Sequence, residues 1–192
     1  MSEMLKLIPF TTPEDHGWQE AWSLYMRAFP EIERRSLEDH LRLMGHNPLF
    51  EADGAWLDGK FAGLIFHWQV GRFRFVEFLA VEDKLRGLNI GSRIMQQMID
   101  RYKEVILEIE PPVDELTRRR LHFYERLGFQ VNDYNYVHPS YAEPQTHFNL
   151  VVLSYLRPLT REEAHQFANF VRLETLKYSG VINPQVPAID LE

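Results

Sequence analysis

"VEDKLRGLNIGSRIMQQMID", residues 81–100, is the stretch that decides the fold of this 192-residue chain. An apolar run precedes it, a loop with two glycines lies within it, and an amphipathic helical pattern begins near Ile90. Proteins hold phosphate groups with a strand, a tight loop and a helix N-terminus, because the first backbone N–H groups of the helix have no partner inside it. The stretch therefore predicts a phosphate site, with Arg86 leading into it.

Two common phosphate-binding loops are excluded by the residues that follow the glycines. A nucleoside-triphosphate P-loop needs a lysine after its last glycine, but Ser92 and Arg93 follow Gly91. A dinucleotide fingerprint needs three glycines, and only Gly87 and Gly91 are present. Two interpretations remain open at this point: a loop that binds a pyrophosphate through backbone N–H groups, or a plain strand-to-helix turn in which glycines only permit tight bending.

Composition limits the class of protein and its partners. The chain suits one domain, with 45% hydrophobic and 26% charged residues. A net charge of -7 argues against a nucleic-acid partner, and the lack of cysteine excludes disulfides and thiolate chemistry. The N-terminus predicts neither a signal peptide nor a membrane span, so we expect a cytoplasmic protein. The histidines lack the i, i+4 spacing of a helical metal site, and we predict no metal.

The order of predicted elements changes part-way along the chain. A strand and two helices, the first capped by Thr12 and the second ending at Gly45, precede three antiparallel strands that contain an Asp58-Gly59 hairpin turn. A helix, a strand and a second helix closed by Gly128 follow, which predicts a parallel strand pair with a right-handed crossover. Two late strands and a terminal helix, with a capping box at Thr160, complete the pattern.

Two motifs in this order resemble a known family. "LAVEDKLRGLNIGS" (residues 79–92) is similar to the acyl-CoA-binding motif Arg/Gln-x-x-Gly-x-Gly/Ala of the GNAT superfamily of N-acetyltransferases. "LHFYERLGF" (residues 121–129) resembles the later motif of the same family, and the spacing of the two motifs and the element order also match. The resemblance covers about Leu5 to Leu156.

The chain departs from the family pattern at two positions. Asn89 stands where the motif has its middle glycine. Asparagine tolerates the left-handed region, so the turn can survive, although its side chain adds bulk near a phosphate. Thr117 stands where the family often has asparagine, and it could bind the cofactor or merely cap its helix.

The resemblance implies an α/β (α+β) fold. We expect a single GNAT-like domain over residues 1–156, with a mixed, mostly antiparallel sheet of about seven strands, one parallel pair and helices on both faces. Residues 157–179 are expected to form an extra C-terminal helix, and residues 180–192 a flexible tail. The apolar stripe of Ala164, Phe167, Ala168 and Val171 must be buried against the domain or against a second copy of the chain, and we favour a homodimer.

The resemblance also implies an activity. The chain is expected to move an acetyl group from acetyl-CoA to a primary amine of a small molecule or peptide, by direct attack in a ternary complex. The alternative is a CoA-binding relative that acts as a sensor or scaffold with little or no turnover. The cofactor-binding residues carried over from the family are Leu79, Ala80, Val81, Arg86, Gly87, Leu88, Asn89, Ile90, Gly91, Ser92 and Thr117.

Two catalytic residues are expected. Tyr124 stands where the family has the hydroxyl that serves the departing thiolate, although a core aromatic is the alternative. Glu77 is the predicted base, because apolar neighbours on its strand should raise the pKa of its carboxyl. The residues expected to share its face of the strand are Phe73, Phe75, Leu79 and Val81. A structural ion pair of Glu77 with an arginine such as Arg72 or Arg74 stays open, as does the use of Glu110 or water as the base.

Overall fold

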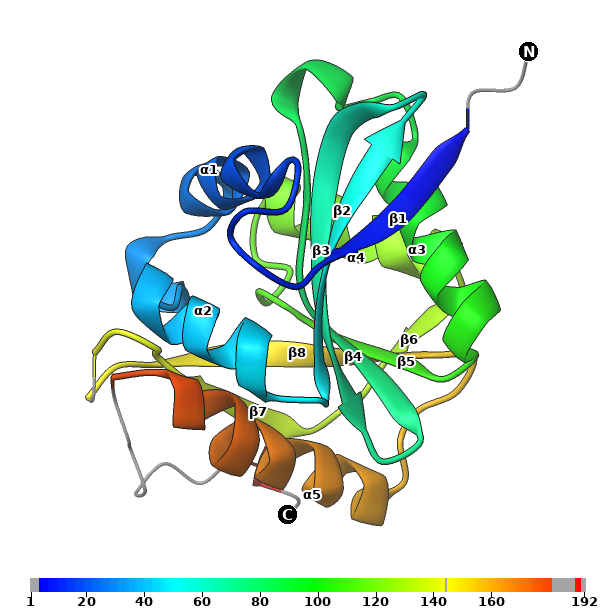
Figure 1. Ribbon diagram of the computed structural model, residues 1–192. Helices are drawn as coiled ribbons and strands as arrows, with labels where there is room; N and C mark the ends of the chain where they lie inside the picture. The colour runs from blue at the N-terminus through cyan, green and yellow to red at the C-terminus, as the bar shows by residue number, and fades with distance from the viewer. Residues whose placement is uncertain (1–3, 144, 181–188, 191–192) are drawn as a thin grey trace.

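The computed structural model describes residues 4–143, 145–180 and 189–190, in which helices cover both faces of a twisted sheet (Figure 1). The strands are β1 (Leu5–Phe10), β2 (Phe50–Leu57), β3 (Lys60–Val70), β4 (Phe73–Val81), β5 (Val105–Ile109), β6 (Phe129–Val131), β7 (Asn135–Pro139), β8 (His147–Tyr155) and β9 (Ile189–Asp190). The α-helices are α1 (Trp18–Ala28), α2 (Leu37–His46), α3 (Ile90–Tyr102), α4 (Glu115–Arg126) and α5 (Arg161–Phe170). Short helical turns are η1 (Glu31–Glu33), η2 (Asp83–Leu85), η3 (Val171–Thr175) and η4 (Leu176–Tyr178).

The sheet confirms the predicted fold class. Its strand order is β1-β2-β3-β4-β5-β8-β7-β9, with β6 also paired to β8. Among the described strands only β4 and β5 are parallel. The strand expected after Gly128 is divided into β6 and β7, because the Asn132 side chain turns away to bond Ser154 and the backbone N–H of Leu159. The sheet therefore has more strands than expected.

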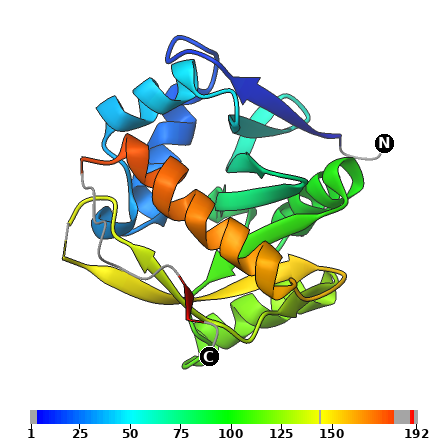
Figure 2. The same ribbon diagram turned by 90° about the horizontal axis from the view of Figure 1, so that it is seen from below.

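The helices divide into two layers. Helices α1, α2 and α5 cover one face of the sheet and α3 and α4 the other (Figures 1 and 2). The first layer encloses an aromatic core that includes Trp18, Phe75 and Phe167, and the second an aliphatic core that includes Ile94 and Leu107. Within the described residues, no helix combines the length and the apolar character that crossing a membrane would need.

Helix α1 begins later than the sequence predicts. Its N-cap is Gly17, with φ of 84°, rather than Thr12. The Asp15 carboxylate accepts the backbone N–H groups of Thr11 and Thr12 at 2.6 and 3.0 Å, so these residues form a turn ahead of the helix. The predicted capping box of α5 is confirmed, since Thr160 and Glu163 cap each other.

A β-bulge at Glu77 shapes the centre of the sheet. The β3–β4 register pairs Phe66 with Phe78 but His67 with Val76, so Glu77 is an extra residue in β4. The expected strand parity of Glu77 with Leu79 and Val81 is therefore wrong: Phe78 belongs to the aromatic core, whereas Leu79 and Val81 pack on the α3 side. The parallel β4–β5 pairing also ends just before the bulge, at Val76 and Leu107.

The C-terminal helix packs on its own domain. All four residues of its apolar stripe are buried within one copy of the chain, and the Phe167 ring lies 5.0 Å from that of Phe75. The stripe therefore needs no second copy of the chain for its burial, and the observation that favoured a homodimer is removed. In the expected tail, Ile189–Asp190 pair with β7, while residues 181–188 and 191–192 lie outside the described residues.

We expect Phe167→Ala to lower the free energy of unfolding by about 3–5 kcal/mol, because a buried ring is replaced by a cavity. Leu173→Ala, at an exposed position on the next turn, should change stability by less than about 0.5 kcal/mol. Urea unfolding measures both values. A Phe167→Ala variant of normal stability but altered sedimentation would show that the stripe serves an interface between copies instead.

Candidate active site

A cavity opens where β4 and β5 separate. It has a volume of about 500 Å³ and extends from the end of their pairing towards α4. Six of the residues predicted from the sequence line it: Glu77, Leu79, Ala80, Val81, Arg86 and Tyr124. A gap beside a parallel strand pair is a common place for a ligand, because it exposes backbone groups that a continuous sheet would use internally.

Backbone donors face this gap. The N–H of Glu82 bonds to the carbonyl of Ala62 on β3. Hydrogen bonding alternates along an antiparallel pair, so the N–H groups of Leu79 and Val81 point to the other edge of β4, the edge that β5 has left. These are the groups that could bond an acyl oxygen as negative charge develops on it.

The loop before α3 presents an open helix N-terminus. Gly87 (φ 81°) and Asn89 (φ 59°) both adopt the left-handed conformation, which confirms that asparagine can replace glycine in this turn. Asn89 makes no side-chain cap, and the first turn of α3 has no acidic residue. By contrast, side chains cap α2, α4 and α5. The N–H groups of Ile90, Gly91 and Ser92, with the helix dipole behind them, are thus suited to an anion.

Arg86 and Thr117 occupy different settings. The Arg86 side chain is exposed and pairs with Asp83 at 2.8 Å, a surface contact that is easily exchanged for another anion. Thr117 and Asp114 form a capping box. The Thr117 hydroxyl donates to the Asp114 carboxylate at 2.8 Å and accepts from the backbone N–H of Asp114 at 3.0 Å. The donor hydrogen of the Thr117 hydroxyl is therefore used in capping α4, and Thr117 lies outside the cavity lining.

Tyr124 is both a core residue and a cavity residue. Its ring packs edge-on against Phe123 and Phe129, and the side chain also lines the gap. Burial raises the pKa of Tyr124 to about 12, partly opposed by the positive charge of Arg120. The phenol is therefore protonated throughout the neutral range and available as a hydrogen-bond donor.

The Glu77 carboxylate is surrounded by hydrogen-bond donors. Arg35 donates to both carboxylate oxygens at 2.8 Å, Trp68 donates its indole N–H at 2.8 Å, and the Tyr141 hydroxyl donates as well. The side chains of Arg35 and Glu77 are 0% and 3% exposed. The open alternative of a structural ion pair is supported by this geometry, but its partner is Arg35 rather than Arg72 or Arg74.

The expected rise in the pKa of Glu77 is wrong. Burial alone would raise it, but the charge and hydrogen bonds of Arg35, with those of Tyr141 and Trp68, bring the pKa below its usual value. A carboxylate held in its charged form by four donors is a poor acceptor of a further proton. Glu110, the other carboxylate considered, is about half exposed and pairs with Arg120.

Comparison with known proteins assigns a family to this arrangement. The family model described as "Acetyltransferase (GNAT) family" matches residues 18–129, more than half of the chain. The chain belongs to the GNAT acetyltransferase family. It is 28% identical over 169 residues to the Bacillus subtilis (strain 168) protein named "Putative acetyltransferase YjbC", over 79% of this chain and 82% of that one.

Solved structures agree with the GNAT assignment. A GNAT-family protein from Bacteroides thetaiotaomicron is 26% identical and superposes with a TM-score of 0.80, covering 90% of this chain and 98% of that one. A Bacillus subtilis acetyltransferase in complex with CoA shares the fold at 13% identity and a TM-score of 0.54, covering 80% and 98%.

Several residues of this GNAT site were missed from the sequence. Arg35, His138 and Tyr141 come from loops or strands far from the two motifs, and no local pattern marks them. Glu33, in the turn after α1, is half-buried in the cavity wall, and burial, with the charge of Glu110, raises its pKa. Glu108 did carry a signal, since it is a carboxylate inside the apolar run "VILEIE".

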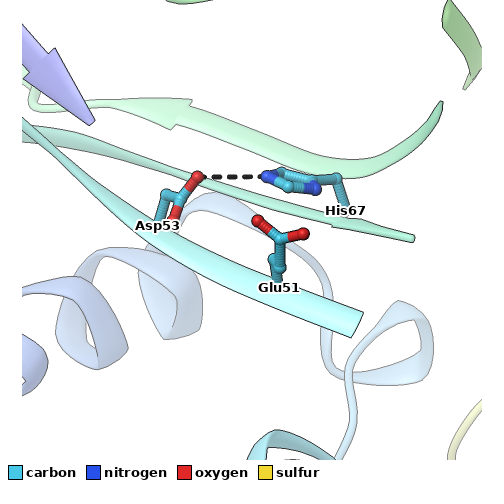
Figure 3. Close-up of side chains that lie close together, drawn as sticks. All are labelled: Glu51, Asp53 and His67. Atoms are coloured by element: carbon cyan, nitrogen blue, oxygen red, sulfur yellow. Dashed lines mark hydrogen bonds and ion pairs between the residues drawn. The ribbon is translucent and has the colours of Figure 1, made fainter. Parts of the chain in front are cut away.

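A second polar cluster lies on the α3 side of the sheet. Figure 3 shows Glu51 and Asp53 of β2 near His67 of β3, with His67 bonded to Asp53 at 3.1 Å. The spacing would suit a cation, yet Arg74 pairs with Glu51 and already balances its charge. Burial lowers the pKa of His67, although the bond to Asp53 opposes this, so the ring stays neutral. We therefore do not assign a metal site to this cluster.

We expect Glu77→Gln to lower the free energy of unfolding by about 3–5 kcal/mol at pH 7, because Arg35 would keep a buried, unpaired charge. The folded-state pKa of Glu77 is lowered, so its contribution is fully present above about 4.5 and is lost as the pH falls through the lower folded value. Urea unfolding at pH 7 and at acid pH should show this loss in the wild type but not in the variant.

The control for this comparison is Glu110→Gln, which removes an exposed carboxylate from a surface pair and should cost less than about 1 kcal/mol. Equal stability of the two variants would contradict the assignment of Glu77 to a buried ion pair.

Proposed function

We propose that this chain is an acetyl-CoA-dependent N-acetyltransferase that acetylates a primary amine by direct attack in a ternary complex. One observation carries the proposal: the free edge of β4, Tyr124 and Arg86, which leads into the open N-terminus of α3, line one cavity. Membership of the GNAT family supports it, as do structural neighbours solved with CoA or acetyl-CoA bound.

In this proposal the α3 N-terminus binds the pyrophosphate of acetyl-CoA. The N–H groups of Ile90, Gly91 and Ser92 supply hydrogen bonds, and Arg86 exchanges Asp83 for a phosphate oxygen. The thioester then lies along β4, where the N–H groups of Leu79 and Val81 bond the acyl oxygen and stabilise the tetrahedral oxyanion.

The amine must lose a proton before it attacks. A lysine-like amine has a pKa near 10.4, so its neutral form costs about 4–5 kcal/mol at pH 7. The amine nitrogen attacks the thioester carbon, and the C–S bond then breaks as the oxyanion collapses. Tyr124 donates a hydrogen bond to the departing thiolate, which stabilises charge that develops only in the transition state. Glu77 orients the site through its bonds to Arg35 and Tyr141 and is a positioning residue in this account.

Arg86→Ala should weaken acetyl-CoA binding and reduce its dependence on salt, because one cation that contacts a phosphate is lost. Asn89→Gly should bind as well or better, since glycine adopts the same left-handed turn without a side chain. Calorimetry over a series of salt concentrations measures both effects.

Arg42→Ala is the matched control for Arg86→Ala, because Arg42 also pairs with an aspartate three residues before it, at 2.9 Å, but on α2. It should leave binding unchanged. Absence of heat at millimolar acetyl-CoA in the wild type would overturn the proposed cofactor site, and weaker binding by Asn89→Gly would contradict the role given to this turn.

Tyr124→Phe should reduce turnover roughly 10–1,000-fold with little change in acetyl-CoA affinity, because the hydroxyl acts on the leaving group rather than on the bound cofactor. Tyr155→Phe is the control, since Tyr155 packs on the same Phe129 ring from β8. Steady-state assays of CoA release test both variants. Parallel losses of stability and binding in Tyr124→Phe would indicate a packing role, and wild-type binding without turnover of any amine would favour a CoA-binding relative.

A further inference from the structure

Glu108 is a buried carboxylate without a counterion. It lies on β5 and lines the cavity, and its side chain is 10% exposed. Its Oε1 atom is buried and has no hydrogen-bond partner. A carboxylate oxygen left unpaired in an apolar interior is costly, and in a ligand cavity it marks the place of a missing donor.

The groups around Glu108 carry no positive charge that is free to balance its carboxylate. Glu77 on β4 is negative and is already balanced by Arg35. His138 on β7 lies 3.8 Å from Oε2, but burial lowers its pKa to about 4, so it is neutral. The remaining neighbours are the phenols Tyr136 on β7 and Tyr141 beyond it, whose pKa values burial raises far above 10. One carboxylate in the cavity is thus left over for a ligand.

We propose that the acceptor is a small amine that enters as a cation, pairs with Glu108 through its ammonium group, and gives Glu108 its proton before attack. This inference rests on the proposed function and adds to it the class of acceptor and the identity of the base. The ammonium supplies both the charge and the N–H donor that Oε1 lacks.

The pKa of Glu108 suits a general base. Burial raises its pKa to about 8, against the opposing effect of the Tyr136 hydroxyl and with the help of the negative charge on Glu77. A base is most effective when its pKa lies near the working pH. A bound ammonium would lower the pKa of Glu108 again, so binding at pH 7 would release a proton.

The cavity walls restrict the rest of the acceptor. Phe29, Phe78, Phe148 and Leu150 form an apolar part of the wall, which suits a short aromatic or aliphatic body. Glu33 adds a second acidic group. Of the cavity arginines, Arg86 binds a phosphate of acetyl-CoA in the proposed complex, and Arg120 pairs with Glu110. A carboxylate next to the amine would meet Glu108 or Glu33 without a free cation among these lining residues, so amino acids are disfavoured relative to simple monoamines.

The protons balance in this scheme. Glu108 releases its own proton to solvent as the ammonium binds, and it then takes one proton from the ammonium, which returns it to its neutral form. The neutral amine forms the new C–N bond, the C–S bond breaks, and the second proton of the nitrogen neutralises the thiolate held by Tyr124. The products are the N-acetylated amine, CoA thiol and one released proton.

Calorimetry with phenethylamine as the probe tests the assignment directly. Titration at pH 7 in two buffers of different ionisation enthalpy should show release of about one proton per amine bound by the wild type, and none by Glu108→Gln. Glu110→Gln, which removes an exposed carboxylate of the same cavity, should retain the release. No binding at millimolar phenethylamine, or binding without proton release, would overturn the inference, and the wild-type result decides this even if Glu108→Gln does not fold.

Kinetics with acetyl-CoA provide the second test. In the wild type, kcat/KM for phenethylamine should rise through an inflection near pH 8, and in Glu108→Gln it should keep rising towards the pKa of the amine. Phenylalanine, which adds a carboxylate, should be at least about tenfold poorer. An unchanged pH profile in the variant, or a preference for phenylalanine, would overturn the inference while leaving acetyl transfer intact. Loss of acetyl-CoA binding would instead overturn the proposed function.

Discussion

The buried pair of Arg35 and Glu77 is the interaction on which the site depends. It joins the segment before α2 to the bulge of β4, and Arg35 also donates to the carbonyl of Thr175 in η3 at 3.1 Å and stacks over the ring of Tyr141 at 4.2 Å. Four parts of the chain are thereby fixed at one point. Replacing water around two ions is expensive, so such a pair persists only when nearly every donor and acceptor is used, as it is for Glu77.

This pair also explains how two nearby carboxyl groups acquire different protonation states. Glu77 and Glu108 come from the two strands that separate at the cavity, and both are almost fully buried. Arg35 holds the first in its charged form, and the second, with no such partner, favours its neutral form. Environments that separate the pKa values of two acids allow one to orient a site while the other exchanges protons.

The sequence predicted the features that are encoded locally. The opening strand, the Asp58-Gly59 turn, the capping of α5 and the left-handed Asn89 follow from the conformational preferences of single residues or short patterns. The order of elements and the two motifs were enough for the fold and for the position of the cofactor loop.

Features that depend on pairing between distant segments could not be predicted. The bulge at Glu77 leaves no mark in the alternation of "RFRFVEFLAV", so the faces of Leu79 and Val81 were misassigned. Arg35 lies 42 residues before Glu77, and nothing in its loop indicates the partner. The pKa of Glu77 was consequently expected to move in the wrong direction, since burial was visible in the pattern and the counterion was not.

Amide hydrogen exchange with and without acetyl-CoA tests the central claim, that the cofactor binds along the free edge of β4 and at the open N-terminus of α3. The account predicts slower exchange at Leu79 and Val81 and at Ile90–Ser92 when acetyl-CoA is bound, because these N–H groups gain acceptors and lose water. Unchanged exchange at both segments under saturating acetyl-CoA, or protection confined to another part of the sheet, would contradict it.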